Sequence, residues 1–160
     1  MFYFGSTAPP RVSMVDPSAE GATGAPFTLD VERGKVIEFA RAIQANHASH
    51  TAEDAVIPAT FLTTQLFWEK LVDDANPWSL VQMSEERGMH AEQEYIFHGP
   101  PPRAGQRLHA SSTIQDITEK TARSGHRLVF VKMVTEYRDA DGKLVAEAIL
   151  TGVERHPPGE

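Results

Sequence analysis

One stretch of the chain is apolar nearly all round at helical spacing: residues 57–72, IPATFLTTQLFWEKLV. Pro58 and Thr60 suit the opening turn of a helix, and the run behind them is long enough for about four turns. Because only a narrow polar side remains, we expect this helix to be mostly enclosed by other elements. The polar positions are Thr64, Gln65, Glu69 and Lys70.

The wrapping for such a helix follows it in the chain, as four apolar runs separated by turn signals. We predict strands over residues 90–98, 108–117, 127–137 and 143–155. The third run has the heaviest apolar loading and should be the central strand. We therefore expect a sheet curled around one central helix, and the alternative is an ordinary helix lying on a flat sheet.

The segment before the apolar stretch predicts a strand and a helix. Residues 27–29 have the pattern of a short strand, and Asp30 after them is a possible helix cap. Residues 32–44 predict a helix, because their apolar positions recur on one face. Those positions are Val36, Ile37, Ala40 and Ile43.

The two ends of the chain differ in composition from the middle. Residues 1–26 are rich in Gly, Pro, Ala, Ser and Thr, which favours an extended segment, and we expect its aromatic residues to dock on the body or on a neighbouring subunit. The docking residues are Phe2, Tyr3 and Phe4. Residues 27–155 form a single domain, and residues 156–160 are a tail.

Composition removes several classes of function. With 15 basic and 22 acidic residues, a net charge of -7 and no basic cluster, the chain is not expected to bind nucleic acid. The absence of cysteine excludes disulfides, thiolate zinc sites and a cysteine nucleophile, and it fits a cytoplasmic protein. The opening Met-Phe-Tyr-Phe is too short for a membrane span and lacks the basic residues of a signal peptide.

Several segments taken in order resemble the MaoC-like hot-dog superfamily, in particular the N-terminal domain of the type I fatty-acid-synthase-like dehydratases. They are residues 36–43 (VIEFARAI), 57–62 (IPATFL), 90–95 (HAEQEY), 103–105 (RAG) and 141–148 (DGKLVAEA). The resemblance implies an α+β hot-dog fold, in which an antiparallel sheet of five or six strands wraps around a long central helix. It also implies acyl thioester substrates on coenzyme A or acyl carrier protein, no cofactor, and dimers that join two sheets edge to edge.

Catalytic relatives have a loop after the first helix that resembles Gly-Asp-x-Asn-Pro-x-His. On that pattern Ala45 replaces the catalytic aspartate, His47 replaces the asparagine, and His50 stands where the family has its histidine. Elimination from a β-hydroxyacyl thioester needs two proton carriers, because it removes a weakly acidic C–H and protonates a poor leaving group. His50 is therefore the first catalytic candidate and His47 the second, although a plain polar loop explains both histidines equally simply.

The thioester carbonyl needs hydrogen-bond donors, and the amides at the start of the central helix supply them in this resemblance. We therefore assign substrate binding to residues 59–62, with the amides of Ala59 and Thr60 at the carbonyl and the side chains of Phe61 and Leu62 along an acyl tunnel. Core packing explains the two apolar side chains equally well.

Three further groups of residues are weaker candidates. A metal site from His47 and His50 with Glu53 or Asp54 is possible, but two histidines spaced by three in a loop are a weak signal and we expect no metal. Glu92 and Asp116 are possible substitute carboxylates. Four arginines are possible partners of a coenzyme A phosphate, although arginines at strand ends usually face water. They are Arg103, Arg107, Arg123 and Arg127.

The preserved scaffold without its aspartate predicts a subunit of a (3R)-3-hydroxyacyl-thioester dehydratase or 2-enoyl-thioester hydratase that is inactive or weakly active alone. Its expected partner is a second copy or a catalytic hot-dog subunit. One alternative is a self-sufficient thioesterase or dehydratase that uses His47 and His50 together. The other is a module that binds an acyl group without transforming it.

Overall fold

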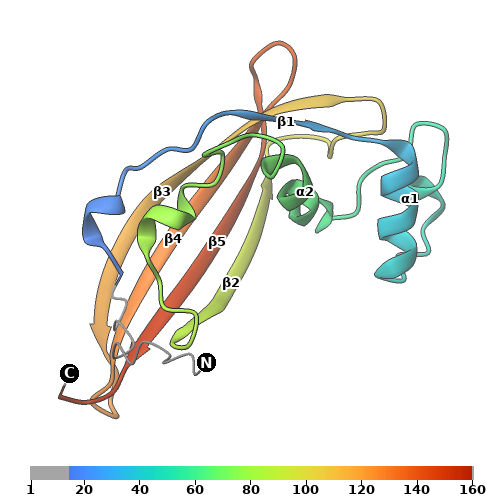
Figure 1. The fold of residues 1–160 in the computed structure, drawn as a ribbon. Helices are drawn as coiled ribbons and strands as arrows, with labels where there is room; N and C mark the ends of the chain where they lie inside the picture. The colour runs from blue at the N-terminus through green and yellow to red at the C-terminus, as the bar shows by residue number, and fades with distance from the viewer. Residues whose placement is uncertain (1–14, 160) are drawn as a thin grey trace, which may run out of the picture.

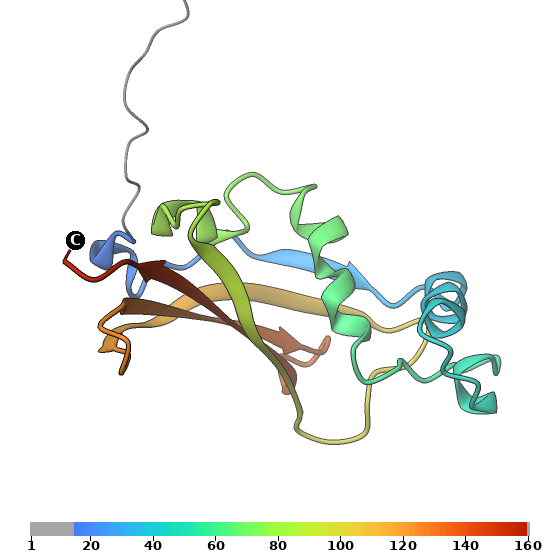
Figure 2. The ribbon, with the colours of Figure 1, turned by 90° about the horizontal axis from the view of Figure 1, so that it is seen from below.

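A computed structural model describes residues 15–159 as a curved five-stranded antiparallel sheet, with the helices of residues 61–81 over one side of it and the helix of residues 33–42 beyond its edge (Figures 1 and 2). The strand order is β1-β3-β4-β5-β2, so β4 is central, as its apolar loading predicts. The strands are β1 (Phe27–Asp30), β2 (Gly88–Phe97), β3 (Arg107–Thr121), β4 (Arg127–Arg138) and β5 (Leu144–His156). None of the helices in this part of the chain has the length and apolarity needed to cross a membrane.

Apart from the 3-10 helix Pro17–Ala19, the helices of the described residues lie between β1 and β2 in the chain. The longest is α1 (Arg33–Ala42), and the central segment is a 3-10 helix (Phe61–Thr64) continued by α2 (Gln65–Glu69). Two more 3-10 helices, Ala48–His50 and Pro77–Val81, flank it along the chain. The sequence left residues 78–88 unassigned. Pro77 opens a helix there because Asn76 Oδ1 caps it by accepting a hydrogen bond from the Trp78 amide (2.9 Å).

The central segment differs from the predicted helix in two respects. It is not a four-turn helix, because the α-helical part has only five residues. It is also turned around its axis: Gln65 and Glu69 face the sheet and are 8% and 4% exposed, whereas Leu66, Phe67 and Leu71 are 51%, 64% and 77% exposed. The prediction that the segment is mostly enclosed is therefore wrong for its second half, where three apolar side chains face water.

The first half of the segment is enclosed as predicted. Phe61 and Leu62 are fully buried in a core that also contains Ala146 and Ala148 of β5. The small side chains of β5 let the segment approach the sheet closely. The ring of Phe61 meets the edge of Phe39 from α1 at 5.6 Å between centroids, which ties α1 to this core.

The boundaries predicted for the ends and for Asp30 need correction. Asp30 belongs to β1 and forms an ion pair with Arg107 (2.6 Å), so it does not cap α1. His156 belongs to β5 and is 1% exposed, so the tail begins after it. Residues 15–26 are not wholly extended, because Pro17–Ala19 form a 3-10 helix. The docking predicted for Phe2, Tyr3 and Phe4 lies outside the described residues.

The opposite exposures of two phenylalanines in one segment give a direct test. Phe61→Ala should lower the free energy of unfolding by about 3–5 kcal/mol, because it leaves a cavity beside Phe39. Phe67→Ala is the matched control and should cost less than about 1 kcal/mol, since it loses only an exposed ring and a contact with Lys35. Urea unfolding of the two variants measures both values, and equal losses would show that the segment is oriented differently.

Candidate functional site

The loop after α1 keeps the backbone shape of a glycine turn without the glycine. Gln44, which stands at the glycine position of the resembled motif, has φ of 58°, in the left-handed region that glycine favours. The Ala45 amide donates to the Ala40 carbonyl (2.8 Å) and the Gln44 amide to the Arg41 carbonyl (3.1 Å), which closes the helix as a Schellman-type cap. The turn therefore has the shape that a glycine at position 44 would favour, but Ala45 brings no carboxylate to it.

His47 begins the next helical turn and is exposed. Its Nδ1 accepts a hydrogen bond from the Ser49 amide (3.3 Å) and lies 2.7 Å from Ser49 Oγ. Because an amide N–H only donates, Nδ1 must carry a lone pair, and the proton of the neutral ring is on Nε2. His47 thus presents an N–H donor at its outer nitrogen.

His50 has the opposite arrangement. Its Nδ1 lies 2.8 Å from the Val56 carbonyl oxygen, and a carbonyl only accepts, so Nδ1 carries the proton. In the neutral ring Nε2 then holds a lone pair and can take a proton. The side chain is half-buried. His50, which stands at the position of the family histidine, is therefore held in the tautomer whose free nitrogen, Nε2, can act as a general base.

The structure brings these two histidines together. Their ring centroids are 6.1 Å apart, with an interplanar angle of 67°. Asp54 is engaged elsewhere, in an ion pair with Arg103 (2.6 Å). No group of three or more metal-ligating side chains occurs within residues 15–159, so the metal-site alternative gains no support from this loop.

The four residues assigned to substrate binding divide into two pairs. Ala59 and Thr60 are exposed at the start of the central segment, whereas Phe61 and Leu62 are fully buried core residues. The Phe61 amide already donates to the Pro58 carbonyl (2.9 Å). Substrate binding by this turn stays a prediction, and within it only the two exposed residues present surface to a ligand.

Among the weaker candidates, Arg103 borders the histidine loop through a β-bridge with Val56, whose carbonyl oxygen lies 2.8 Å from His50 Nδ1. Glu92 and Asp116 line a separate hollow with Lys120 and Lys132. Arg107 pairs with Asp30, which lowers the pKa of that aspartate and raises the pKa of the arginine through the hydrogen bond between them. Arg103 and Arg127 also form ion pairs, with Asp54 and Glu119.

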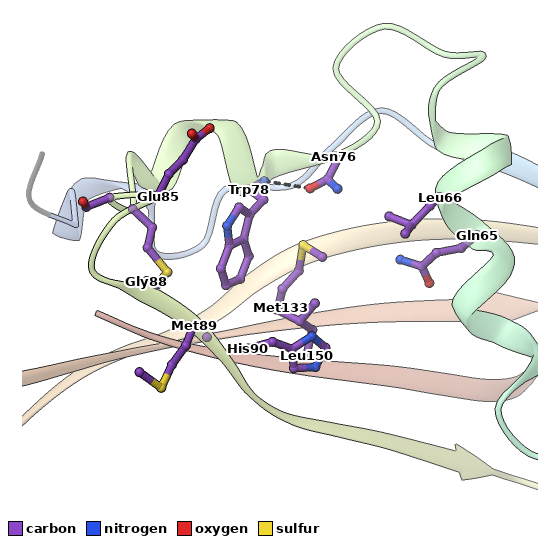
Figure 3. A pocket seen from close by; sticks show the side chains of 13 residues that line it. Gln65, Leu66, Asn76, Trp78, Glu85, Gly88, Met89, His90, Met133 and Leu150 are labelled. Carbon is purple, nitrogen blue, oxygen red and sulfur yellow. Dashed lines mark hydrogen bonds between the residues drawn. The ribbon is translucent and has the colours of Figure 1, made fainter. Parts of the chain in front are cut away.

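A feature that the sequence did not predict is a cavity of about 370 Å³ between α2, the helix Pro77–Val81 and the sheet (Figure 3). Leu66 and Gln65 point into it from α2, and the Trp78 indole points into it from the helix Pro77–Val81. Met133 and Leu150 line it from the sheet. A smaller cavity of about 150 Å³ shares five lining residues with it: Gln65, Leu66, His90, Met133 and Leu150.

Behind the cavity lies a network of buried polar side chains. Glu69 accepts hydrogen bonds from Gln65 Nε2 (2.8 Å) and from Asn76 Nδ2 (3.2 Å). The Tyr137 hydroxyl donates to Gln65 Oε1, and Gln65 Nε2 also contacts Thr135 Oγ1 (3.3 Å). The sequence contained one usable signal for this network, the i, i+4 spacing of Gln65 and Glu69 within an apolar stretch.

Burial sets the protonation of this network. Desolvation raises the pKa of Glu69 above its usual 4.5, and the hydrogen bonds from Gln65 and Asn76 only partly oppose it. Tyr137 is fully buried, and burial, together with the nearby Glu69, raises its pKa well above 10.0. Tyr137 therefore stays a neutral hydrogen-bond donor.

A family model and a curated relative both match most of this chain. The family model described as "FAS1-like, dehydratase domain region" matches residues 18–148. The UPF0336 protein ML1908 of Mycobacterium leprae is 32% identical over 135 residues, which cover 76% of this chain and 74% of that protein.

Two solved structures are similar along nearly the whole described chain. The HadBC (3R-hydroxyacyl-ACP dehydratase) complex of Mycobacterium tuberculosis has 27% identity and a TM-score of 0.60, covering 84% of this chain and 96% of the other. The ChsH1-ChsH2 complex of the same organism has 15% identity and a TM-score of 0.65, covering 87% of each chain. These similarities confirm the predicted hot-dog fold.

The buried carboxyl of Glu69 predicts a pH dependence of stability. Because its pKa is raised in the folded chain, the folded state holds more protons than the unfolded state above pH 4.5, so this group lowers stability as pH rises. Glu69→Gln removes that titration. The difference in unfolding free energy between variant and wild type should move in favour of the variant from pH 4 to pH 7, measured by urea unfolding.

The exposed Glu86→Gln variant is the matched control for this comparison. A difference for Glu69→Gln that stays constant across the same pH range would show that Glu69 titrates alike in the folded and unfolded chain.

Proposed function

Because the chain belongs to the family of FAS1-like dehydratase domain regions, we propose that it is one subunit of a (3R)-3-hydroxyacyl-thioester dehydratase, or in reverse a 2-enoyl-thioester hydratase. The substrate is an acyl thioester on coenzyme A or acyl carrier protein. This chain holds the acyl group, and a second hot-dog chain supplies the aspartate and histidine that move the protons. Alone it is inactive or slow. We place it in the cytoplasm.

The observation that carries the proposal is the histidine loop without a carboxylate. The loop keeps the left-handed turn at Gln44 and a base-competent His50, but position 45 offers only a methyl group. General acid–base catalysis contributes about 10²- to 10⁴-fold, but elimination needs both a base and a group that protonates the leaving hydroxyl, and this loop offers only the base. A partner chain with both carriers supplies what this loop lacks.

The exposed apolar side of the central segment supports a partner chain. Leu66, Phe67 and Leu71 are more than half exposed, and β2 beside them is the edge strand of the sheet. An unpaired strand edge next to apolar side chains favours pairing with another sheet. The HadBC and ChsH1-ChsH2 structures, which are similar to this chain, are complexes of two named components. We accordingly propose a heterodimer, with a homodimer as the alternative.

A second candidate function is supported by the tautomers of the two histidines. His50 offers a lone pair at Nε2 and His47 offers an N–H at Nε2, so a neutral pair contains one proton acceptor and one proton donor. With ring centroids 6.1 Å apart, the two rings are close enough to act on one substrate group beside them. This arrangement would make the chain a self-sufficient dehydratase or thioesterase.

Hydration of crotonyl-CoA by the purified chain distinguishes the two functions. We expect a rate close to background, changed less than about tenfold by His50→Ala, because a lone base without its partner acid gives little acceleration. Spectrophotometric loss of the enoyl thioester measures the rate. His126→Ala, in the β3–β4 turn, is the matched control.

Rapid hydration by the pure chain that falls by about 10² or more in both His47→Ala and His50→Ala would overturn the first function in favour of the second. Rapid hydrolysis of the thioester by the same pair would identify the thioesterase version.

A further inference from the structure

The face of the sheet that points away from α2, here called the outer face, carries a hollow of about 470 Å³ lined from β2, β3, β4 and β5. Thr151 of β5 lies between Leu150 and Gly152, which line the cavity beside Trp78, so its side chain points to the outer face. Lys132 lies in β4 between two buried core residues and points to the outer face for the same reason. The hollow is therefore separated from that cavity by the sheet itself.

Two β-bulges turn carboxylates into this hollow. The pairing of β2 shifts between His90 and Glu92, and the pairing of β3 shifts between Ile114 and Asp116. Side chains alternate between the two faces of a strand, and one extra residue reverses the alternation for those that follow. His90 lines the cavity beside α2 and Ile114 belongs to the core, so both point to the inner face. Without the bulges Glu92 and Asp116 would point there as well.

The strand register aligns four polar side chains in one row across the hollow. Lys132 is opposite Asp116 on one side and Thr151 on the other. Thr151 is in turn opposite Glu92. Because neighbouring strands lie about 4.8 Å apart, the backbones of Lys132 and Glu92 are about 10 Å apart. The row therefore has an ammonium group and a carboxylate on either side of a hydroxyl.

A second ammonium group lies at the lysine end of the row. Lys120 of β3 places its Nζ 5.5 Å from the centroid of the Phe130 ring, which also lines the hollow. Phe130 is two residues from Lys132 in β4, so the two lysines flank one aromatic ring on the same face. This end of the hollow combines positive charge with an apolar floor.

The hydroxyl in the middle of the row has no partner. Thr151 is 8% exposed, and its Oγ1 makes no hydrogen bond within residues 15–159. Buried hydroxyls are nearly always hydrogen-bonded in folded proteins, so this atom calls for a partner. Since it lines the hollow, a bound ligand can supply that partner.

We propose that the outer hollow binds a small zwitterion, a molecule with a carboxylate at one end and an ammonium group at the other. The carboxylate lies at Lys120 and Lys132, the chain of the ligand crosses Thr151, and the ammonium group meets Glu92. Two lysines and two carboxylates line the hollow, which favours a ligand without net charge, and the net charge of -7 on the chain disfavours a simple anion. This inference does not depend on the proposed function.

Titration of the purified full chain with 6-aminohexanoate tests the inference, followed through the backbone amide NMR signals around Thr151. We expect half-saturation at about 1 mM or below, with shifted signals confined to the hollow. Hexanoate and hexylamine each carry only one of the two charges, so each should bind at least about tenfold more weakly.

Substitutions in the row separate its three roles. Thr151→Val keeps the size of the side chain and removes the hydroxyl, so it should weaken 6-aminohexanoate about tenfold, whereas Thr151→Ser should keep the affinity. Glu92→Gln should weaken 6-aminohexanoate and leave hexanoate unchanged, and Lys132→Gln should weaken it and leave hexylamine unchanged. Glu94→Gln is the matched control, because Glu94 points to the same face of β2 but lies outside the hollow. Circular dichroism checks that each variant is folded.

Three results would overturn the inference. One is the absence of shifted signals up to about 10 mM 6-aminohexanoate in the wild type. Another is binding that Thr151→Val and Glu92→Gln leave unchanged, or that Glu94→Gln weakens as much as they do. The third is equal affinity for hexanoate and 6-aminohexanoate, which would identify a site for anions in place of a site for zwitterions.

Discussion

The orientation of the central segment depends on hydrogen bonds between its polar side chains and β4. Gln65 connects the Tyr137 hydroxyl, Thr135 and Glu69 in one buried network. Turning the segment to bury its apolar side would leave the Tyr137 hydroxyl without Gln65, at about 1–3 kcal/mol for a buried group, whereas Thr135 would keep its contact with Ser112. The present orientation instead leaves Leu66, Phe67 and Leu71 more than half exposed, at about 1.5–3 kcal/mol for each side chain that could be buried. A partner that covers this apolar side would remove that cost.

The same network reaches the cavity beside Trp78. Gln65 and Leu66 line this cavity from α2, and Met133 and Leu150 line it from the sheet. Asn76 donates to Glu69 and accepts from the Trp78 amide, so Trp78 and α2 are both connected to one carboxyl group, Glu69.

The parts of the fold that were predictable from the sequence are those set by local pattern. The alternation of apolar and polar residues and the turn signals located the strands. The high apolar content of residues 127–137 predicted that β4 is the central strand, as the strand order confirms. The orientation of α2 was not predictable in this way. Helical spacing distinguishes a polar side of the segment from an apolar side, but it does not predict which side faces the sheet. Here the side is set by a hydrogen bond from Tyr137, 72 positions away in the chain, to Gln65. The cavity beside α2 was missed as well.

In the candidate site, too, the sequence located the residues but not the hydrogen bonds that determine their chemistry. Sequence spacing correctly brought His47 and His50 together, because three residues in one loop cannot lie far apart. Their chemistry depends on which nitrogen each ring uses, and that is set by the amide of Ser49 for one ring and by the carbonyl of Val56 for the other. Backbone groups thus give His50 its basic nitrogen and His47 its donor, although neither ring has a carboxylate to stabilise an imidazolium. A neutral pair of this kind can bind a polar group readily, but it gains no help in holding the charge that forms during proton transfer. This difference is the physical reason to assign the proton chemistry to a partner and the acyl chain to this subunit.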